Sequence, residues 1–302
     1  LKKLSTDFIA ALSSDQIGNL STAKISALSS TQIAAIETDD ITALTSTQLN
    51  ALNSLQISSL STDQISALSD DQVSNLATSQ IKFLTTAQAQ ALTSSQIQAM
   101  SGSQIAAMSA AQLSNLDSGA IQAMQSTALT ALTTSQIRGL TTGFIDTLTS
   151  DQVQLLDSDQ IAALTTAQVN ALDTDDIGGL STDQIEGLTS YQLSNIDSDL
   201  LGALTDDQVA AFSSTQVKGL STASMALLST SQLAALSSSA IGGLRAEQLN
   251  SLDSDGVAAL VGGVADISTV QFGQLSSDFI DNLGSAQIAA LTSDQLSRLT
   301  ST

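Results

Sequence analysis

The sequence predicts an all-α solenoid, a superhelix of very short capped helices with one helix in each eight-residue repeat. Three observations lead to this prediction. An apolar pair recurs every eight residues, a helix N-cap signature recurs in register with it, and most acidic residues fall at or just after the cap. One octad buries too little surface to fold alone, so neighbouring octads have to stack as they do in other repeat proteins.

The octad is clear in Leu60–Leu68, LSTDQISAL, and it returns along nearly the whole chain. Numbered from its leucine, 32 octads run in phase over residues 4–259 and four more run over residues 267–298. Positions 1 and 6 are apolar in all 36 octads. In one continuous helix of about 100° per residue, this apolar pair would drift by about 80° per octad, which excludes a long amphipathic helix.

Position 2 supplies the cap of each expected helix. It is Ser, Thr, Asp or Asn in 31 of 36 octads, and position 5 is Gln in 24 of them. Such a pair forms a capping box, and the apolar residues at positions 1 and 6 then form the hydrophobic staple around it. The distribution of acidic residues supports the same helix start, because 23 of the 29 acidic residues fall at positions 2 to 4. There they favour the positive end of the helix dipole, so each octad is expected to start one helix.

Departures from Gln at position 5 suggest how the octads wind. Asp176, Leu200 and Ser224 are 24 residues apart, as are Ala120 and Phe144. This spacing predicts three octads per coil, with positions 1 and 6 pointing inward. Position 8 is mostly Ala, with Gly and Asn as variants, and we expect a tight corner of left-handed backbone there.

A β-solenoid is the alternative fold. Isoleucine and valine at position 6 suit strands. Positions 1 and 6 have opposite parity, however, so in a strand they would point to opposite faces of the sheet. Short helices are therefore the preferred interpretation.

Three parts follow from the phase of the repeat. Residues 1–259 are expected to form a regular octad solenoid. Residues 260–266, LVGGVAD, are a heptad that breaks the phase, which we interpret as a hinge or a local change of twist. Residues 267–302 resume the octads and stop within a repeat, so we expect the array to continue beyond the sequence at hand.

Composition argues against several classes of function. The net charge is −21 with eight Lys and Arg, which disfavours nucleic acid and anionic membrane surfaces as partners. No apolar run approaches the 18 residues that a membrane span needs, so no membrane insertion is expected. Histidine and cysteine are absent, so the many hydroxyls have no histidine base beside them and no cysteine nucleophile is present. We therefore expect no enzyme, no catalytic residue and no obligate cofactor.

A repetitive Ser/Thr/Asp surface that binds calcium, a glycan, a mineral or ice is the alternative to a purely structural role. Calcium prefers several oxygen ligands, and closely spaced aspartates could supply two or three. The preferred interpretation of these aspartates is that they cap helices. The candidate calcium ligands are Asp157, Asp159, Asp173, Asp175, Asp176, Asp197, Asp199, Asp253 and Asp255.

The recurring unit L-[ST]-[ST]-x-Q-[IV]-x-A, as in LSTDQISAL at 60–68 and LTTAQVNAL at 164–172, resembles octapeptide repeat arrays of large bacterial surface or secreted, adhesin-like proteins. The resemblance implies an extracellular or cell-surface stalk, spacer or filament-forming subunit. It also implies self-association, end to end or laterally, with contact to a cell surface or a glycan as a further expectation. It assigns no functional residue, and the glycine-rich nonapeptide that binds calcium in many such proteins is absent here.

Overall fold

The computed structural model describes residues 3–260 and 263–299 and confirms the all-α solenoid. Within these residues there are 36 α-helices of four to six residues, one 3-10 helix and no strand, so the β-solenoid alternative is wrong. Each octad holds one α-helix, and the heptad at 260–266 holds the 3-10 helix η1.

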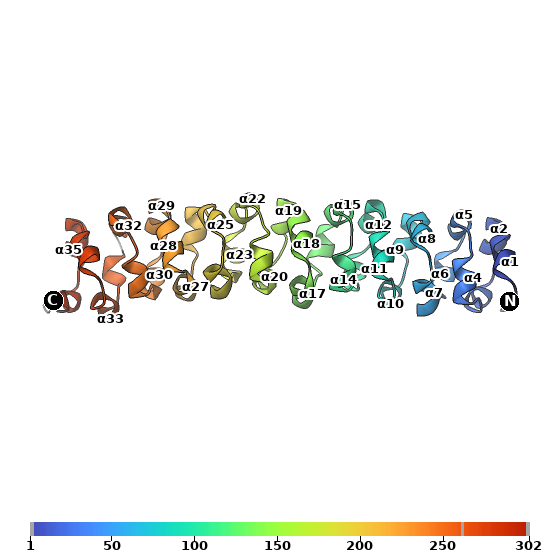
Figure 1. Cartoon of the computed structure of the whole chain (residues 1–302), viewed down its shortest axis with the longest axis horizontal. Helices are drawn as coiled ribbons and strands as arrows, with labels where there is room; N and C mark the ends of the chain where they lie inside the picture. The colour runs from blue at the N-terminus through green and yellow to red at the C-terminus, as the bar shows by residue number, and fades with distance from the viewer. Residues whose placement is uncertain (1–2, 261–262, 300–302) are drawn as a thin grey trace. The chain divides into compact units, whose positions relative to one another are not determined.

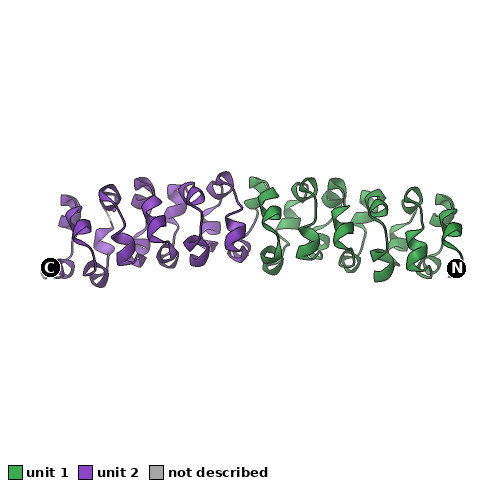
Figure 2. Cartoon of the chain, in the orientation of Figure 1, with its two compact units in different colours: residues 1–155 green, residues 156–302 purple. Residues whose placement is uncertain are grey.

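The chain divides into two compact units, residues 1–155 and 156–302 (Figure 2). Figure 1 shows that short helices follow one another in a regular winding within each unit. The helices of unit 1 are α1 (Thr6–Ala10), α2 (Ser14–Gly18), α3 (Thr22–Ser26), α4 (Ser30–Ala34), α5 (Thr38–Ile41), α6 (Ser46–Asn50), α7 (Ser54–Ser58), α8 (Thr62–Ala67), α9 (Asp70–Ser74), α10 (Thr78–Ile81), α11 (Thr86–Gln90), α12 (Ser94–Ala99), α13 (Gly102–Ala106), α14 (Ala110–Leu113), α15 (Ser118–Gln122), α16 (Ser126–Leu129), α17 (Thr134–Gly139), α18 (Thr142–Thr147) and α19 (Ser150–Val153). Those of unit 2 are α20 (Ser158–Ala163), α21 (Thr166–Val169), α22 (Thr174–Gly178), α23 (Thr182–Gly187), α24 (Ser190–Ser194), α25 (Ser198–Gly202), α26 (Asp206–Ala210), α27 (Ser214–Gly219), α28 (Thr222–Leu227), α29 (Thr230–Ala235), α30 (Ser238–Gly243), α31 (Ala246–Leu249), α32 (Ser254–Ala259), η1 (Val264–Asp266), α33 (Thr269–Phe272), α34 (Ser277–Asp281), α35 (Ser285–Ala290) and α36 (Ser293–Leu296).

The cap at position 2 starts each helix as the sequence predicts. In α8, Ser61 has extended backbone, with φ −72° and ψ 161°. The Gln64 N–H donates to Ser61 Oγ at 3.0 Å, and the Ser61 N–H donates to Gln64 Oε1 at 2.8 Å. This reciprocal pair uses backbone donors that have no partner inside the helix. Where Ala77 stands at the cap, only the glutamine half forms, with the Ala77 N–H 3.3 Å from Gln80 Oε1.

The corner between successive helices differs from the prediction. It is made by two extended residues at positions 1 and 2, such as Leu68 (φ −57°, ψ 139°) and Ser69 (φ −70°, ψ 158°). No described residue, glycine or other, has a positive φ, so the predicted left-handed corner at position 8 is wrong.

Small residues occupy position 8 because another coil approaches there. A Cβ on Gly187 would lie 2.5 Å from the carbonyl oxygen of Ser158, and one on Gly219 would lie 2.5 Å from that of Ser190. Both pairs are 29 residues apart, which places position 8 against position 3 of the octad three repeats earlier. Lack of space explains the small side chains, and backbone strain does not.

Helices three apart in the chain pack on each other, which confirms three octads per coil. In unit 1, α9 packs on α12 and α12 on α15, and in unit 2, α20 packs on α23 and α24 on α27. Positions 1 and 6 are buried in nearly every coil, as for Leu60 and Ile65, so each unit has one continuous apolar core.

The glutamine at position 5 ties each coil to the one before it, a role that sequence reasoning missed. Gln64 is 2 % exposed, and its Nε2 donates to the carbonyl oxygens of Ile33 at 3.2 Å and Ile36 at 2.6 Å. In unit 2, Gln192 Nε2 donates in the same way to Ile161 at 2.9 Å and Leu164 at 2.8 Å. The Ile33 and Ile161 carbonyls lie near the C-terminal ends of α4 and α20 and also accept the backbone N–H groups of Ile36 and Leu164, whereas the Ile36 and Leu164 carbonyls follow the helix end. One buried amide thus bonds to the start of its own helix and to the end of the helix four repeats earlier, as Gln64 of α8 does with α4. We call this arrangement the glutamine link.

The link continues across the predicted phase break at 260–266, of which residues 261 and 262 lie outside the described residues. The predicted break lies inside unit 2, and η1 replaces the α-helix of the heptad. Gln287 Nε2 donates to the Val257 carbonyl at 2.6 Å, 30 residues back instead of the usual 31. Gln295 Nε2 donates to the carbonyl oxygen of Val264 in η1 at 2.9 Å. The heptad is therefore one shortened repeat of the same winding.

Candidate functional site

A hollow of about 780 Å³ lies on unit 2, lined by residues of α27, α30, α31 and the region of α33. Gly242 and Gly243, the last two residues of α30, line it without side chains, and Gly243 packs closely against the Ser214 backbone. Lys218, Arg245 and Glu247 bring three charged side chains to it. The rest of its lining is mostly hydroxyl and amide groups, among them Ser214, Thr215, Ser239, Ser268 and Gln271.

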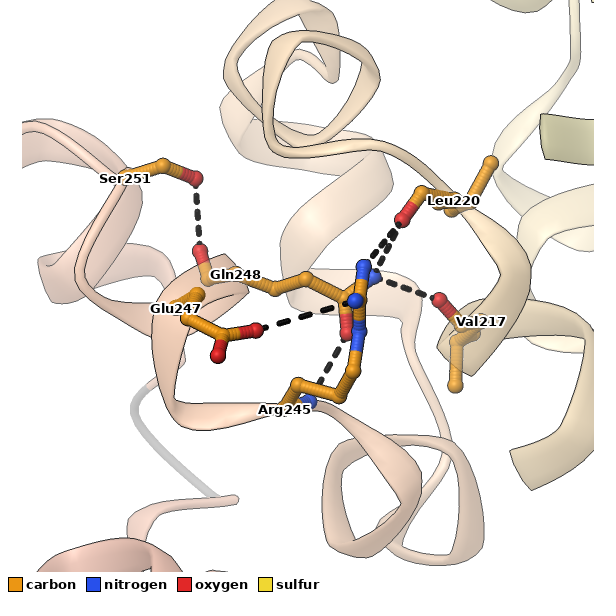
Figure 3. A network of polar contacts seen from close by, with 6 residues as sticks. All are labelled: Val217, Leu220, Arg245, Glu247, Gln248 and Ser251. Atoms are coloured by element: carbon orange, nitrogen blue, oxygen red, sulfur yellow. Dashed lines mark hydrogen bonds and ion pairs between the residues drawn. The ribbon is translucent and has the colours of Figure 1, made fainter. Parts of the chain in front are cut away.

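Arg245 is held at the hollow by a glutamine link, shown in Figure 3. It occupies the cap position, and its N–H donates to Gln248 Oε1 at 2.8 Å. Gln248 is fully buried, and its Nε2 donates to the carbonyl oxygens of Val217 at 2.8 Å and Leu220 at 2.7 Å. The guanidinium donates to the same Leu220 carbonyl at 3.2 Å. The Gln248 side chain therefore holds the Arg245 backbone and the Leu220 carbonyl holds its guanidinium, while the side chain stays 42 % exposed.

Two cations and one carboxylate set the electrostatics of the hollow. Arg245 Nη1 lies 3.6 Å from Glu247 Oε2, which is the one salt bridge between described residues. Lys218 lies in the last turn of α27, where a cation complements the helix dipole, and its side chain is exposed. Lys218 and Arg245 are 27 residues apart in the chain, so only the coil spacing brings them to one hollow.

Most of the predicted calcium ligands act as caps or lie exposed in a first turn. Asp157, Asp173 and Asp253 each accept the N3 N–H of their helix, at 2.8, 2.7 and 2.8 Å. Asp197 stands at the cap of α25 without a side-chain cap bond. The first-turn candidates with exposed side chains are Asp159, Asp175, Asp199 and Asp255.

Asp176 differs from the other candidates because it is buried. It replaces the usual glutamine, and its Oδ2 accepts the Asp173 N–H at 3.1 Å. Its Oδ1 is buried and has no hydrogen-bond partner among the described residues. Among the described residues as a whole, no three acidic side chains lie close enough together to hold a metal ion. Calcium binding stays a prediction, which thermal melting with and without calcium tests.

The helices are short in every described segment. None of those within residues 3–260 and 263–299 has the length and apolar character to cross a bilayer.

Comparison with family models gives several matches to one repeat. The ALTTAQ repeat matches residues 9–46, 33–78, 134–166, 155–190, 169–206 and 264–301. Together these segments cover more than half of the chain, and every one of them contains several octads. No curated protein matches the chain as a relative.

Proposed function

Because the chain belongs to the ALTTAQ repeat family, we propose that it is a non-enzymatic structural segment, a stalk, spacer or filament-forming part, at the surface of a bacterial cell or outside it. The observation that carries this proposal is the glutamine link, which recurs with the same spacing along both units.

The glutamine link supports a structural role for a physical reason. Helices of four to six residues are unstable alone, because nucleation is unfavourable and few hydrogen bonds follow it. Within each unit, neighbouring coils are tied together by a continuous core and by buried amides. Stability then depends on contacts between neighbouring repeats, so length can be added without a new core.

Surface location is tested with antibodies against the purified chain, applied to intact and to permeabilised cells of the source organism. Labelling of intact cells is the expected result. Labelling that requires permeabilisation would contradict a cell-surface role.

Self-association is tested separately, by sedimentation velocity and electron microscopy of purified chain over a range of concentrations. Growth into fibres, end to end or side by side, is expected of a filament-forming segment. A single species at all concentrations would exclude the filament and leave the spacer or stalk as the proposal.

A further inference from the structure

We propose that the hollow between α27, α30, α31 and α33 binds an acidic saccharide, with Lys218 and Arg245 holding its carboxylate or sulfate group. The proposal goes beyond a structural role, and its test does not depend on where the chain is located. Three observations carry it: the local charge, the polar lining and the fixed position of Arg245.

The charge around the hollow is opposite to that of the chain. The net charge of the protein is −21, yet Glu247 is the one acidic residue between Asp207 and Asp253. That stretch also holds Lys218 and Arg245, so it carries one net positive charge. Screening over about 8 Å at physiological ionic strength weakens the field of more distant carboxylates. An anion at the hollow therefore meets Lys218, Arg245 and Glu247, which together carry one net positive charge.

The lining suits a sugar that carries the anion. Ser214, Thr215, Ser239 and Ser268 offer hydroxyls, and Gln271 offers an amide. These groups exchange hydrogen bonds with sugar hydroxyls, whereas a simple inorganic anion would leave most of them unused. The volume of about 780 Å³ lies in the range of ordinary small-ligand sites, of roughly 300–1,000 Å³.

Arg245 gives the hollow a fixed donor. Its guanidinium donates to the Leu220 carbonyl and pairs with Glu247, so a binding anion meets a side chain that is already ordered. Charge-assisted hydrogen bonds from a guanidinium to a carboxylate or sulfate are stronger than neutral ones. Lys218, for which no salt bridge forms among the described residues, supplies the second charge.

The probe is a tetrasaccharide of alternating glucuronic acid and N-acetylglucosamine, titrated into the full chain by calorimetry. A neutral tetrasaccharide of N-acetylglucosamine and an equal concentration of sodium acetate are the ligand controls. We expect saturable binding of the acidic sugar alone, weakened by added salt. Lys218→Gln and Arg245→Ser should each reduce the affinity about tenfold, the size expected for loss of one charge-assisted hydrogen bond.

The variants are chosen to keep the fold. Arg245→Ser installs the preferred cap residue, and Lys218→Gln changes an exposed side chain. Lys82→Gln is the matched control, because Lys82 also stands at position 7 in a stretch without acidic residues, between Asp71 and Asp117. It lines a hollow of about 360 Å³ that has no second cation. Absence of saturable binding, equal binding of the neutral sugar or of acetate, or unchanged affinity in the Lys218→Gln/Arg245→Ser double variant would overturn the proposal.

Discussion

Both the oxygen and the nitrogen of the side-chain amide at position 5 form hydrogen bonds. Gln64 accepts through Oε1 from its own cap and donates through Nε2 to the coil before it. The capping box alone would allow glutamate as well, since a carboxylate also accepts from the cap N–H. No octad has glutamate at position 5. A carboxylate has no donor for the carbonyls of the preceding coil, so the link accounts for the absence of glutamate, and Asp40 and Asp176 are the two carboxylates at this position.

Gln64→Glu should therefore destabilise unit 1 by about 2–4 kcal/mol, because it places an unpaired carboxylate against carbonyl oxygens in the core. Thermal unfolding followed by circular dichroism measures the change. Gln16→Glu is the matched control, since Gln16 also caps its helix but is exposed. Equal loss of stability in the two variants would contradict the link.

Asp176 gives the reverse test. Its buried Oδ1 has no partner among the described residues, and a buried polar atom without one costs free energy. Asp176→Gln restores the usual residue and should stabilise the protein by about 1–3 kcal/mol. Asp175→Asn, a change to its exposed neighbour, should shift the melting temperature little. A lower melting temperature for Asp176→Gln would show that the site needs the carboxylate.

Some of these roles could be predicted from sequence and others could not. The cap and box depend on residues three apart, so the octad itself reveals them. The burial of Gln64 depends on groups 28 and 31 residues away, which no local pattern encodes. Lys218 and Arg245 were missed for the same reason, since they are 27 residues apart in the chain and no single octad contains both.

At the scale of the element, each helix is short because extended residues at positions 1 and 2 end it and cap the next one, as Leu68 and Ser69 do. Position 8 meets position 3 of the octad three repeats earlier, as Gly187 meets Ser158. Small residues there have two physical explanations, left-handed backbone or close approach, and composition alone does not separate them. The prediction of a left-handed corner assumed left-handed backbone, and the observed φ values show that close approach is the correct explanation.

Gly187→Ala and Gly202→Ala should have opposite effects. A Cβ at Gly187 would lie 2.5 Å from a carbonyl oxygen, whereas one at Gly202 meets no atom within 4 Å. Crowding should destabilise the first variant by about 1–3 kcal/mol. The higher helix propensity of alanine should stabilise the second by about 0.5–1 kcal/mol. Denaturant unfolding of both variants checks the signs, and stabilisation in both would show that position 8 has free space.

At the scale of the whole molecule, the same coil is repeated along each unit with few changes. The sequence predicted the fold class and the three octads per coil, because the period and the 24-residue spacing of departures were both visible. The division of the chain at residue 155 has no counterpart in the repeat phase, which is unbroken there. The surface location and the binding of an acidic saccharide are proposals that depend on properties outside the repeat pattern.

The measurement that tests the winding most directly is cysteine pairing, since the natural sequence has no cysteine. Ser59 Oγ donates to the Ser30 carbonyl at 3.1 Å, so positions 30 and 59 lie side by side on consecutive coils. The double variant Ser30→Cys/Ser59→Cys should form a disulfide on mild oxidation, because such a bond needs closely placed Cα atoms. Two control variants combine Ser30→Cys with Ala51→Cys or with Ala67→Cys. Each also pairs position 3 with position 8, but the two octads are two or four repeats apart instead of three. Three octads per coil predicts rapid intramolecular pairing in the first variant alone, and preferential pairing in either of the other two would contradict it.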